Sequence, residues 1–308
     1  MPEYDLIIIG GGPAGTAAGV YASRKRLKTL LITKEWGGQS TVSSDIQNWI
    51  GTNSISGENL AKSFREHLYA YADEVLTVKE KTLVRKLEKT GELFSVTMED
   101  ASIATAGAVL ITSGSKRRQL TAPGAAEFEN KGLTYCASCD GPLFAGQDVA
   151  VIGGGNAGFE TAAQLLAYAK SVTLLHHGTS FKADPVTIER VLSHPNMKGL
   201  TGVETTAIVG DKFVSGLRYK NASGEEELLP VAGVFVEIGM IPNSDFAADL
   251  IPLDEYKRIK IDPWTQKTEV PGIWAAGDCT NIKYHQNNIS AGDAVRALED
   301  IYVTLKTK

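Results

Sequence analysis

The chain has 308 residues, of which 43% are hydrophobic and 22% are charged, a composition that suits about two folded domains and excludes a disordered protein. Its formal net charge of −5 argues against a nucleic-acid partner, because such proteins usually carry a clustered basic surface. The acidic start, the short apolar run 6–9 and only three cysteines lack the features of a secretory signal, a membrane span or a secreted disulfide framework. We therefore expect a cytoplasmic protein with no membrane partner.

The first structural pattern is a strand, a glycine turn and a helix. The β-branched run 6–9 leads into Gly-Gly-Gly-Pro-Ala-Gly at 10–15, and small residues then recur at helical spacing. Gly10 allows the tight turn, Gly12 lets the backbone approach a pyrophosphate, and Gly15 lets the helix pack closely on the strand. This context predicts a dinucleotide-binding unit of the Rossmann type.

A second strand at 29–33 ends at Lys34 and Glu35. An acid that binds the ribose is expected roughly 20 residues after the glycine fingerprint, and Glu35 fits this role by chemistry. A further turn, Gly37-Gly38-Gln39, exposes backbone, and Asn48 lies on the loop that follows.

The next segments complete this first unit. Apolar residues at helical spacing predict a helix from 58 to 71, and the runs 75–78, 83–87, 94–98 and 108–112 predict strands, the middle ones antiparallel. The segment around Pro123-Gly124 is interpreted as a linker into a second unit.

The segment Cys136-Ala-Ser-Cys139-Asp140 carries the reactive groups. Cysteines three positions apart can close a disulfide, the thiolate performs the exchange, and Asp140 can exchange a proton with a leaving thiolate. A zinc site needs four ligands, and neither a second Cys-x-x-Cys nor the five scattered histidines offer the spacing. We predict no metal and favour redox catalysis over an inert pair.

The opening pattern then recurs. The strand 149–152 leads into Gly153, Gly155 and Gly158, a second fingerprint that indicates a second dinucleotide or a duplicated fold. Weak alternation from 205 to 229 predicts antiparallel hairpins, residues 240–243 a second crossing, and 290–305 a helix that completes the first unit from the C-terminus.

Together these motifs resemble the low-molecular-weight bacterial thioredoxin reductases over nearly the whole chain. The segment 135–144 also resembles the flavoprotein subunit of alkyl hydroperoxide reductase, without its N-terminal extension. The resemblance implies an α/β fold of two three-layer Rossmann-like domains, the second inserted into the first. The FAD-binding domain would comprise 1–114 and 241–308, and the inserted nicotinamide-nucleotide domain 115–240.

The resemblance also implies residue roles. Cys139 would face the flavin, Cys136 would attack the partner's disulfide, and Asp140 would be the acid and base. The inserted domain would rotate about hinges at 114–123 and 240–243. The expected cofactor-binding residues are Gly10, Gly12, Ala14, Gly15, Glu35, Gly38, Gln39, Asn48, Gly277, Asp278, His285 and Gln286 for FAD, and Gly153, Gly155 and Gly158 for a nicotinamide nucleotide.

The electron donor depends on the loop after residue 175. NADPH selection favours arginine, whose planar fork pairs a phosphate, but His176-His177-Gly178 provides none and leaves Lys182 as its only cation. An acid for the ribose of NADH is also missing before Asp184. Because the glycine turn is intact, we expect NADH first, reduced ferredoxin second and NADPH third.

The expected acceptor is a thioredoxin-like or glutaredoxin-like protein disulfide, and the resemblance implies a homodimer. A hypothesis of another class is a redox sensor that signals through Cys136 and Cys139 without turnover. Measured reduction of a disulfide substrate distinguishes an enzyme from a sensor.

Overall fold

The computed structural model describes residues 3–43, 45–72 and 74–306. It divides into two compact units, residues 1–116 with 241–308 and residues 117–240. Two short paired strands, β7 (Ser115–Arg117) and β16 (Met240–Pro242), contain both points at which the chain passes from one unit to the other. Pro123 and Gly124, which we interpreted as the crossing, lie inside the second unit, where the Pro123 carbonyl accepts a hydrogen bond from the Ile208 N–H at 2.8 Å.

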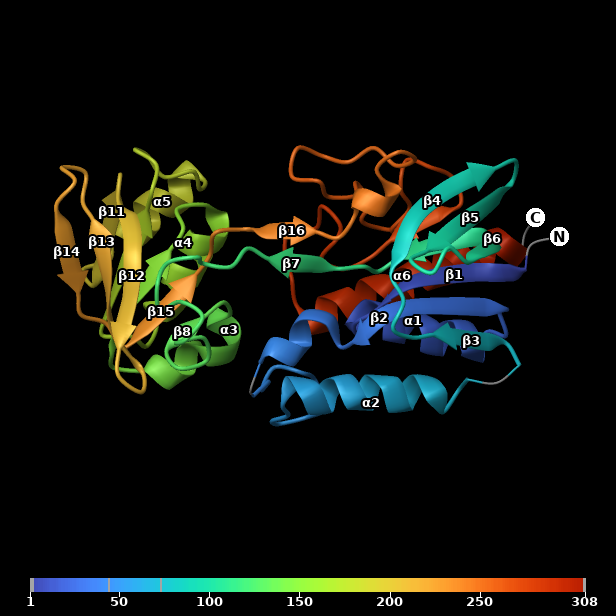
Figure 1. Ribbon diagram of the computed structural model, residues 1–308, viewed down its shortest axis with the longest axis horizontal. Coiled ribbons are helices and arrows are strands. Elements are labelled where there is room, and N and C mark those ends of the chain that lie inside the picture. The colour runs from blue at the N-terminus through green and yellow to red at the C-terminus, as the bar shows by residue number, and fades with distance from the viewer. Residues whose placement is uncertain (1–2, 44, 73, 307–308) are drawn as a thin grey trace. The chain divides into compact units, whose positions relative to one another are not determined.

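The first unit is built on one mixed sheet (Figure 1). Its strands follow the order β3-β2-β1-β6-β5-β4, with β17 parallel to β6. The strands are β1 (Tyr4–Gly11), β2 (Thr29–Trp36), β3 (Leu76–Lys79), β4 (Val84–Thr90), β5 (Leu93–Met98), β6 (Ile103–Ile111) and β17 (Ile273–Ala275). The antiparallel pairing of β4 with β5 and of β5 with β6 confirms the predicted antiparallel layer.

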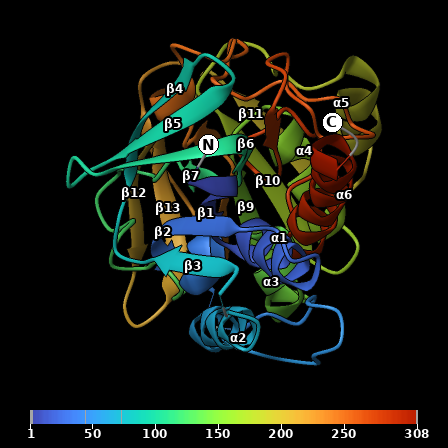
Figure 2. The same ribbon diagram turned by 90° about the vertical axis from the view of Figure 1, so that its right-hand side faces the viewer.

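The helices of this unit pack on its sheet. They are α1 (Pro13–Arg24), η1 (Gly38–Val42), α2 (Gly57–Tyr69), η3 (Asp245–Ala247) and α6 (Asn287–Lys306). α1 and α6 lie side by side (Figure 2) and share a core with Leu6 and Ile8, whereas Ile7 and Ile9 point into the opposite core, which includes Ala247 of η3. Alternate residues of β1 therefore face opposite layers, as the strand period of two requires.

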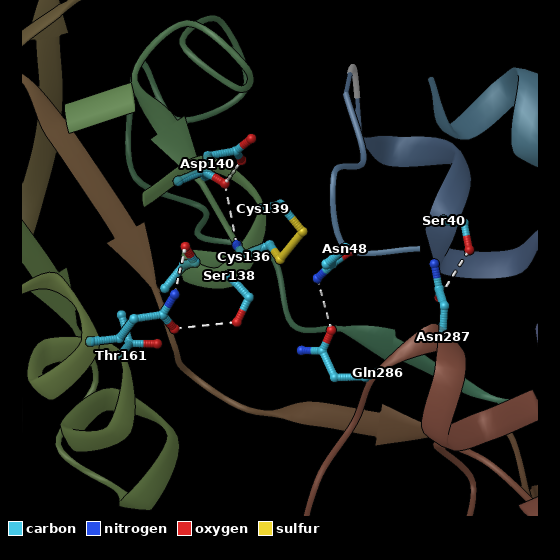
Figure 3. The surroundings of a disulfide bond; sticks show 12 residues. Ser40, Asn48, Cys136, Ser138, Cys139, Asp140, Thr161, Gln286 and Asn287 are labelled. Atoms are coloured by element: carbon cyan, nitrogen blue, oxygen red, sulfur yellow. Dashed lines mark hydrogen bonds between the residues drawn. A yellow bond between two sulfur atoms is a disulfide. The ribbon is translucent and has the colours of Figure 1, made fainter. Parts of the chain in front are cut away.

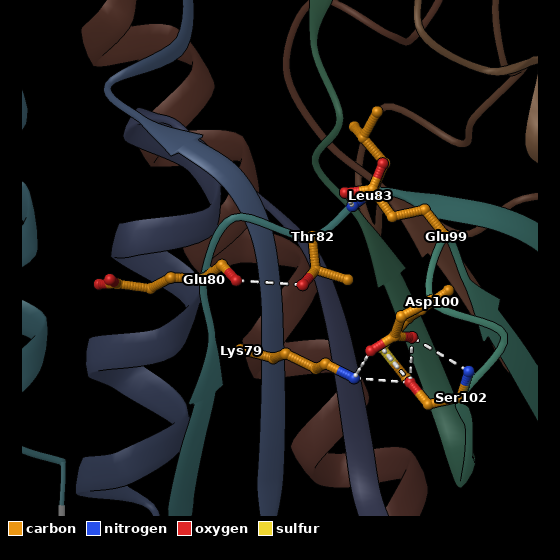
Figure 4. Close-up of polar contacts among 8 residues, drawn as sticks. Lys79, Glu80, Thr82, Leu83, Glu99, Asp100 and Ser102 are labelled. Atoms are coloured by element: carbon orange, nitrogen blue, oxygen red, sulfur yellow. Dashed lines mark hydrogen bonds and ion pairs between the residues drawn. The ribbon is translucent and has the colours of Figure 1, made fainter.

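A polar cluster secures the turns of the first unit (Figure 4). Lys79 at the end of β3 donates to Asp100 at 2.8 Å and to Ser102 at 2.6 Å. Its ammonium group and the Ser102 contacts keep the pKa of Asp100 well below its usual range. The pair is largely exposed, so its role is to fix the β5–β6 turn against β3 rather than to add much stability.

The second unit repeats the plan. Its parallel sheet has the order β11-β10-β9-β15-β8, and an antiparallel sheet β12-β13-β14 packs on it, which confirms the predicted hairpins. The strands are β8 (Leu133–Thr134), β9 (Asp148–Ile152), β10 (Ser171–His176), β11 (Met197–Thr201), β12 (Glu204–Gly210), β13 (Val214–Lys220), β14 (Glu226–Leu229) and β15 (Gly233–Val236); the helices are α3 (Ala137–Asp140), η2 (Gly141–Phe144), α4 (Asn156–Leu165) and α5 (Pro185–Leu192).

Side chains alternate across β9 as they do across β1. Ala150 and Ile152 join the core under the antiparallel sheet, and Val149 and Val151 join the core under α4 and α5. α5 starts where it does because Pro185 is its first residue and the Asp184 carboxylate accepts the Val186 and Thr187 N–H groups at 3.0 and 3.2 Å. The two Rossmann-like units predicted from the sequence are thus present as α/β layers.

Candidate functional site

The first glycine turn has the geometry that close helix packing requires. Gly10 has φ +123°, in the region that favours glycine. A Cβ added at Gly15 would lie 1.8 Å from the Gly10 carbonyl oxygen, so the helix can start this close to the strand only without one. Ala14 is buried beside it. The tight turn and the close approach of the helix to the strand thus require glycine at positions 10 and 15, as the fingerprint predicts.

The start of α1 leaves room for an anion. Gly12 is the N-cap, with extended backbone, and among the described residues nothing lies within 4 Å of where its Cβ would be. The first N–H groups of a helix lack partners within the helix and attract negative charge. The turn therefore fits the pyrophosphate of a dinucleotide such as FAD.

Further expected residues of the first unit converge on this turn. A Cβ at Gly38 would lie 3.8 Å from Gly12, and one at Gly277 would lie 3.5 Å from Ala14 Cβ. Gly38 opens η1, which also contains Gln39. The loops after β2 and β17 thus end beside the same helix N-terminus.

A second group of contacts joins the loop at 48 to the segment before α6 (Figure 3). Asn48 Nδ2 donates to Gln286 Oε1 at 3.1 Å. Asp278 Oδ1 accepts from Ser290 at 3.3 Å and lies 3.3 Å from His285 Nδ1. That His285 nitrogen is buried; its contact with Asp278 does not have hydrogen-bond geometry, and it has no other partner among the described residues. The structure thus brings the predicted residue Asn48 next to Gln286, although the two lie far apart in the sequence, and it places the predicted residues Asp278 and His285 close together.

At the end of β2, Glu35, the residue expected to bind the ribose, and its neighbour Lys34 have different surroundings. The Lys34 ammonium group lies 3.0 Å from Glu99 and is thereby occupied by that carboxylate. Glu35 is exposed, and its carbonyl accepts the Thr33 hydroxyl at 2.6 Å and lies near Gly11. Of the two, Glu35 is the residue placed next to the glycine turn.

The second glycine turn repeats these features. Gly153 has φ +131°, and a Cβ at Gly158 would lie 1.9 Å from the Gly153 carbonyl oxygen. Gly155 is the extended N-cap of α4, with no described atom within 4 Å of its Cβ position. This turn also fits a pyrophosphate.

Two of the three cysteines, Cys136 and Cys139, lie in the second unit (Figure 3). Cys136 and Cys139 form a disulfide with Cα atoms 5.3 Å apart, and both side chains are partly exposed. α3 follows Cys136, whose carbonyl accepts the Asp140 N–H at 3.0 Å. Gln164 of α4 holds this segment through Ser138 at 3.2 Å and the Ala137 carbonyl at 3.3 Å.

Asp140 is connected to the disulfide segment through Thr134. The Thr134 hydroxyl donates to the Asp140 carboxylate, and the Thr134 oxygen accepts the Cys136 N–H at 3.2 Å. Thr134 is the last residue of β8, next to β15 in the sheet. A protonatable carboxyl group is therefore fixed beside the disulfide segment, an arrangement that suits proton transfer during thiol exchange.

Cys279, the third cysteine, belongs to a different environment. It is fully buried in the first unit, and burial raises the pKa of its thiol to about 11. A protonated, inaccessible thiol cannot exchange. Cys279 is therefore a small core residue and not a third redox group.

The end of β10 bears the residues expected to read a nucleotide. His176 is buried beside Phe181 and His177, and neither of its ring nitrogens has a hydrogen-bond partner at normal geometry in the described structure. Burial, with the neighbouring His177 and Lys182, lowers the pKa of His176. The ring is therefore uncharged at neutral pH and offers no cation to a phosphate.

A cavity of about 170 Å³ opens at the ends of β9 and β10. Its polar side chains are His177, Glu204 and Thr205, set among apolar ones; the other lining residues are Leu120, Ile152, Gly153, Leu175, Val203 and Ile238. Sequence reasoning missed Glu204 because it searched for an acid only in the loop directly after β10. The Gly202 and Val203 N–H groups donate to the carbonyls of Gly178 and His176 at 2.8 and 3.1 Å, and this places Glu204, the first residue of β12, beside the end of β10.

Within the described residues, no group of three or more His, Cys, Asp or Glu side chains is arranged to hold a metal ion. None of the helices described is both long and apolar enough for a bilayer crossing.

Comparison with known proteins identifies the class. The family model described as pyridine nucleotide-disulphide oxidoreductase matches residues 4–292. A thioredoxin reductase structure from Streptococcus pyogenes superposes with a TM-score of 0.88 at 32% identity, covering 99% of both chains. One from Giardia duodenalis gives a TM-score of 0.91 at 27% identity, again covering 99% of both chains.

Curated relatives agree. An NADH dehydrogenase of Bacillus subtilis is 38% identical, and an alkyl hydroperoxide reductase component of Staphylococcus aureus is 39% identical, each over 96% of this chain and 57% of the relative. The chain thus spans about half the length of the curated relatives it matches. It belongs to the pyridine nucleotide-disulphide oxidoreductase family, and its fold is that of the thioredoxin reductases.

Proposed function

We propose that the protein passes electrons from NADH through FAD and the Cys136–Cys139 disulfide to a disulfide of a thioredoxin-like or glutaredoxin-like protein. The observation that supports this most directly is the partly exposed disulfide with Asp140 held beside it through Thr134. An inert structural disulfide has no need of a carboxyl group fixed in this way.

In this proposal residues 1–114 and 241–308 bind FAD, and residues 115–240 bind the nicotinamide nucleotide. Gly10, Gly12 and Gly15 place the helix N-terminus against the FAD pyrophosphate, and Glu35 binds the adenosine ribose. The segments at 38–39, 48, 277–278 and 285–286 line the flavin side, as their mutual contacts support. Bound FAD would supply the two-electron step between the nucleotide and the disulfide.

The cysteines then carry out thiol–disulfide exchange. Cys136 attacks the partner's disulfide as a thiolate, and Cys139 resolves the mixed disulfide, which restores the Cys136–Cys139 bond and releases the partner as a dithiol. Asp140 exchanges the proton that the departing thiolate requires. The Thr134 hydroxyl orients that carboxyl group.

The cavity beside His177 supports NADH as the donor. Glu204 can accept a hydrogen bond from a ribose 2′-hydroxyl, and its negative charge would repel a 2′-phosphate. None of the described residues that line the cavity is an arginine, and the buried, neutral His176 supplies no positive charge. These features favour a nucleotide without the extra phosphate.

The test is anaerobic mixing of the oxidised flavoprotein with NADH, NADPH or reduced ferredoxin while the flavin absorbance is followed. We expect fast bleaching by NADH and slow bleaching by NADPH. Glu204→Arg should narrow or reverse this preference, whereas Glu225→Gln, an exposed acid of the same hairpin layer, should leave it unchanged. Fast bleaching by NADPH in the wild type would contradict the NADH assignment. Bleaching by reduced ferredoxin alone would show that ferredoxin, and not NADH, is the electron donor.

We also propose that the protein acts as a homodimer. Light scattering at micromolar concentration should give twice the chain mass, and a monomer would contradict this.

A further inference from the structure

Glu237 occupies a special place beside the second glycine turn. It directly follows β15, and its N–H donates to the Ile152 carbonyl at 2.7 Å. A Cβ at Gly153 would lie 2.0 Å from the Glu237 carbonyl oxygen. β9 pairs with β10 on one side and with β15 on the other. This is the point where the strand order reverses direction, and ligands of open α/β sheets bind in the crevice outside such a point.

The Glu237 side chain is mostly withdrawn from solvent. The Thr161 hydroxyl of α4 donates to its carboxyl group at 2.9 Å. The charged groups that act on it are Arg117, which favours the carboxylate, and Glu160, which disfavours it. Burial outweighs both the hydrogen bond and Arg117, and it raises the pKa of Glu237 to about 7. The carboxyl group therefore changes its charge near neutral pH.

The turn itself does not require an acid at this position. In the first unit the equivalent residue is Thr112, whose N–H donates to Ile9 at 2.9 Å and whose carbonyl oxygen lies 2.2 Å from a Cβ placed on Gly10. Thr112 is neutral, and its hydroxyl is used locally, on the Ile9 carbonyl at 2.9 Å. The carboxyl group of Glu237 is thus an addition to the same backbone geometry.

We propose that nucleotide binding at the second glycine turn takes up a proton from solvent at the Glu237 carboxyl group. A dinucleotide brings a negatively charged pyrophosphate to the turn, and a buried carboxylate beside it would repel that charge in a medium of low dielectric. A carboxylic acid does not repel it and can also donate a hydrogen bond. This inference rests on the proposed function, because it assumes that a nucleotide binds at this turn.

Calorimetric titration of the oxidised holoenzyme with NAD⁺ tests the proposal without turnover. Measurements in buffers of different ionisation enthalpy give the protons taken up per nucleotide. We expect uptake near zero at pH 5.5 and approaching about one proton at pH 8, with the dissociation constant rising up to about tenfold per pH unit above pH 7. Glu237→Gln should abolish the uptake and flatten the pH dependence. Glu189→Gln, an exposed acid on α5, should retain both.

A second variant guards against misfolding of the first. Thr161→Val removes the hydrogen bond that favours the carboxylate, so the pH window of proton uptake should move upward. Flavin content and melting temperature report whether either variant is folded. NAD⁺ binding with no proton uptake and no pH dependence would overturn the inference and leave the proposed function intact. Absence of NAD⁺ binding and of reduction by NADH at every pH would overturn both.

Discussion

The two glycine turns have nearly the same backbone and different surroundings. In each turn, a Cβ added to the third glycine would lie under 2 Å from the carbonyl oxygen of the first glycine. A Cβ added to the second glycine, at the start of the helix, would meet no described atom within 4 Å. The side chains at the neighbouring strand ends differ. Beside the middle of the turn, Thr33 in the first unit corresponds to the buried His176 in the second. At the other flank, Thr112 corresponds to Glu237.

This difference teaches where specificity resides. The glycine backbone supplies what every dinucleotide shares, a close approach of the pyrophosphate to a helix N-terminus. The residues at the ends of the flanking strands decide charge, size and protonation. In the proposed function the first turn holds a cofactor permanently and has small neutral neighbours, whereas the second binds and releases a donor and has titratable ones.

The cysteine variants give the largest expected effect, and they separate the disulfide chemistry from the two glycine turns. Cys136→Ser and Cys139→Ser should each abolish disulfide reduction, because exchange needs an attacking and a resolving thiolate. Both should keep FAD and its reduction by NADH, which depend on the turns. Turnover with a thioredoxin disulfide and stopped-flow absorbance measure the two properties. Residual turnover in either variant would contradict the disulfide relay.

Within the second unit, Asp140→Asn should slow transfer to the partner about 10²–10⁴-fold, the usual cost of losing a general acid or base. Reduction of the flavin by NADH should stay within a few-fold, since neither turn contains this carboxyl group. Thr134→Val should give a smaller loss of the same kind. An unchanged rate of disulfide reduction would leave Asp140 with a structural role.

Replacing the third glycine of each turn by alanine tests whether the two turns bind different ligands. Gly15→Ala should lose most of its FAD on purification. Gly158→Ala should remain yellow while reduction by NADH falls about 100-fold, since a displacement of about 1 Å at a positioning site costs this much. Gly292→Ala, where a Cβ meets no described atom, is the matched control. Loss of FAD from Gly158→Ala would show that the units do not divide the ligands in this way.

The smallest expected effect is on stability. It arises because the second turn has the titratable Glu237 where the first turn has the neutral Thr112. The folded state holds a proton on Glu237 up to about pH 7, whereas the unfolded chain releases it near pH 4.5. The free energy of unfolding therefore falls as pH rises across this window, by at most about 3 kcal/mol. Glu237→Gln should be more stable than the wild type at pH 8 and similar near pH 4.5. Parallel urea midpoints for the two proteins across this range would contradict the raised pKa.

The sequence alone determined the parts that depend on neighbouring residues. Glycine spacing after a β-branched run indicated both turns, because the close approach of helix and strand excludes a side chain at fixed positions. The Cys-x-x-Cys-Asp segment indicated disulfide exchange from the intrinsic chemistry of its residues. Periodicity indicated α2 and α6 and the antiparallel layers, with boundaries displaced by a few residues.

Only the tertiary structure decided which distant residues meet. Glu204 joins His177 at one cavity because the Gly202 and Val203 N–H groups donate to the carbonyls of Gly178 and His176. Thr134 orients Asp140 because the chain turns from β8 into α3. The burial of Glu237 likewise depends on α4 packing across β9 and β15. The first crossing lies at Arg117 and not at Pro123, since the latter segment hydrogen-bonds to β12. Local sequence carries no information on such contacts, because they follow from how whole sheets and helices pack.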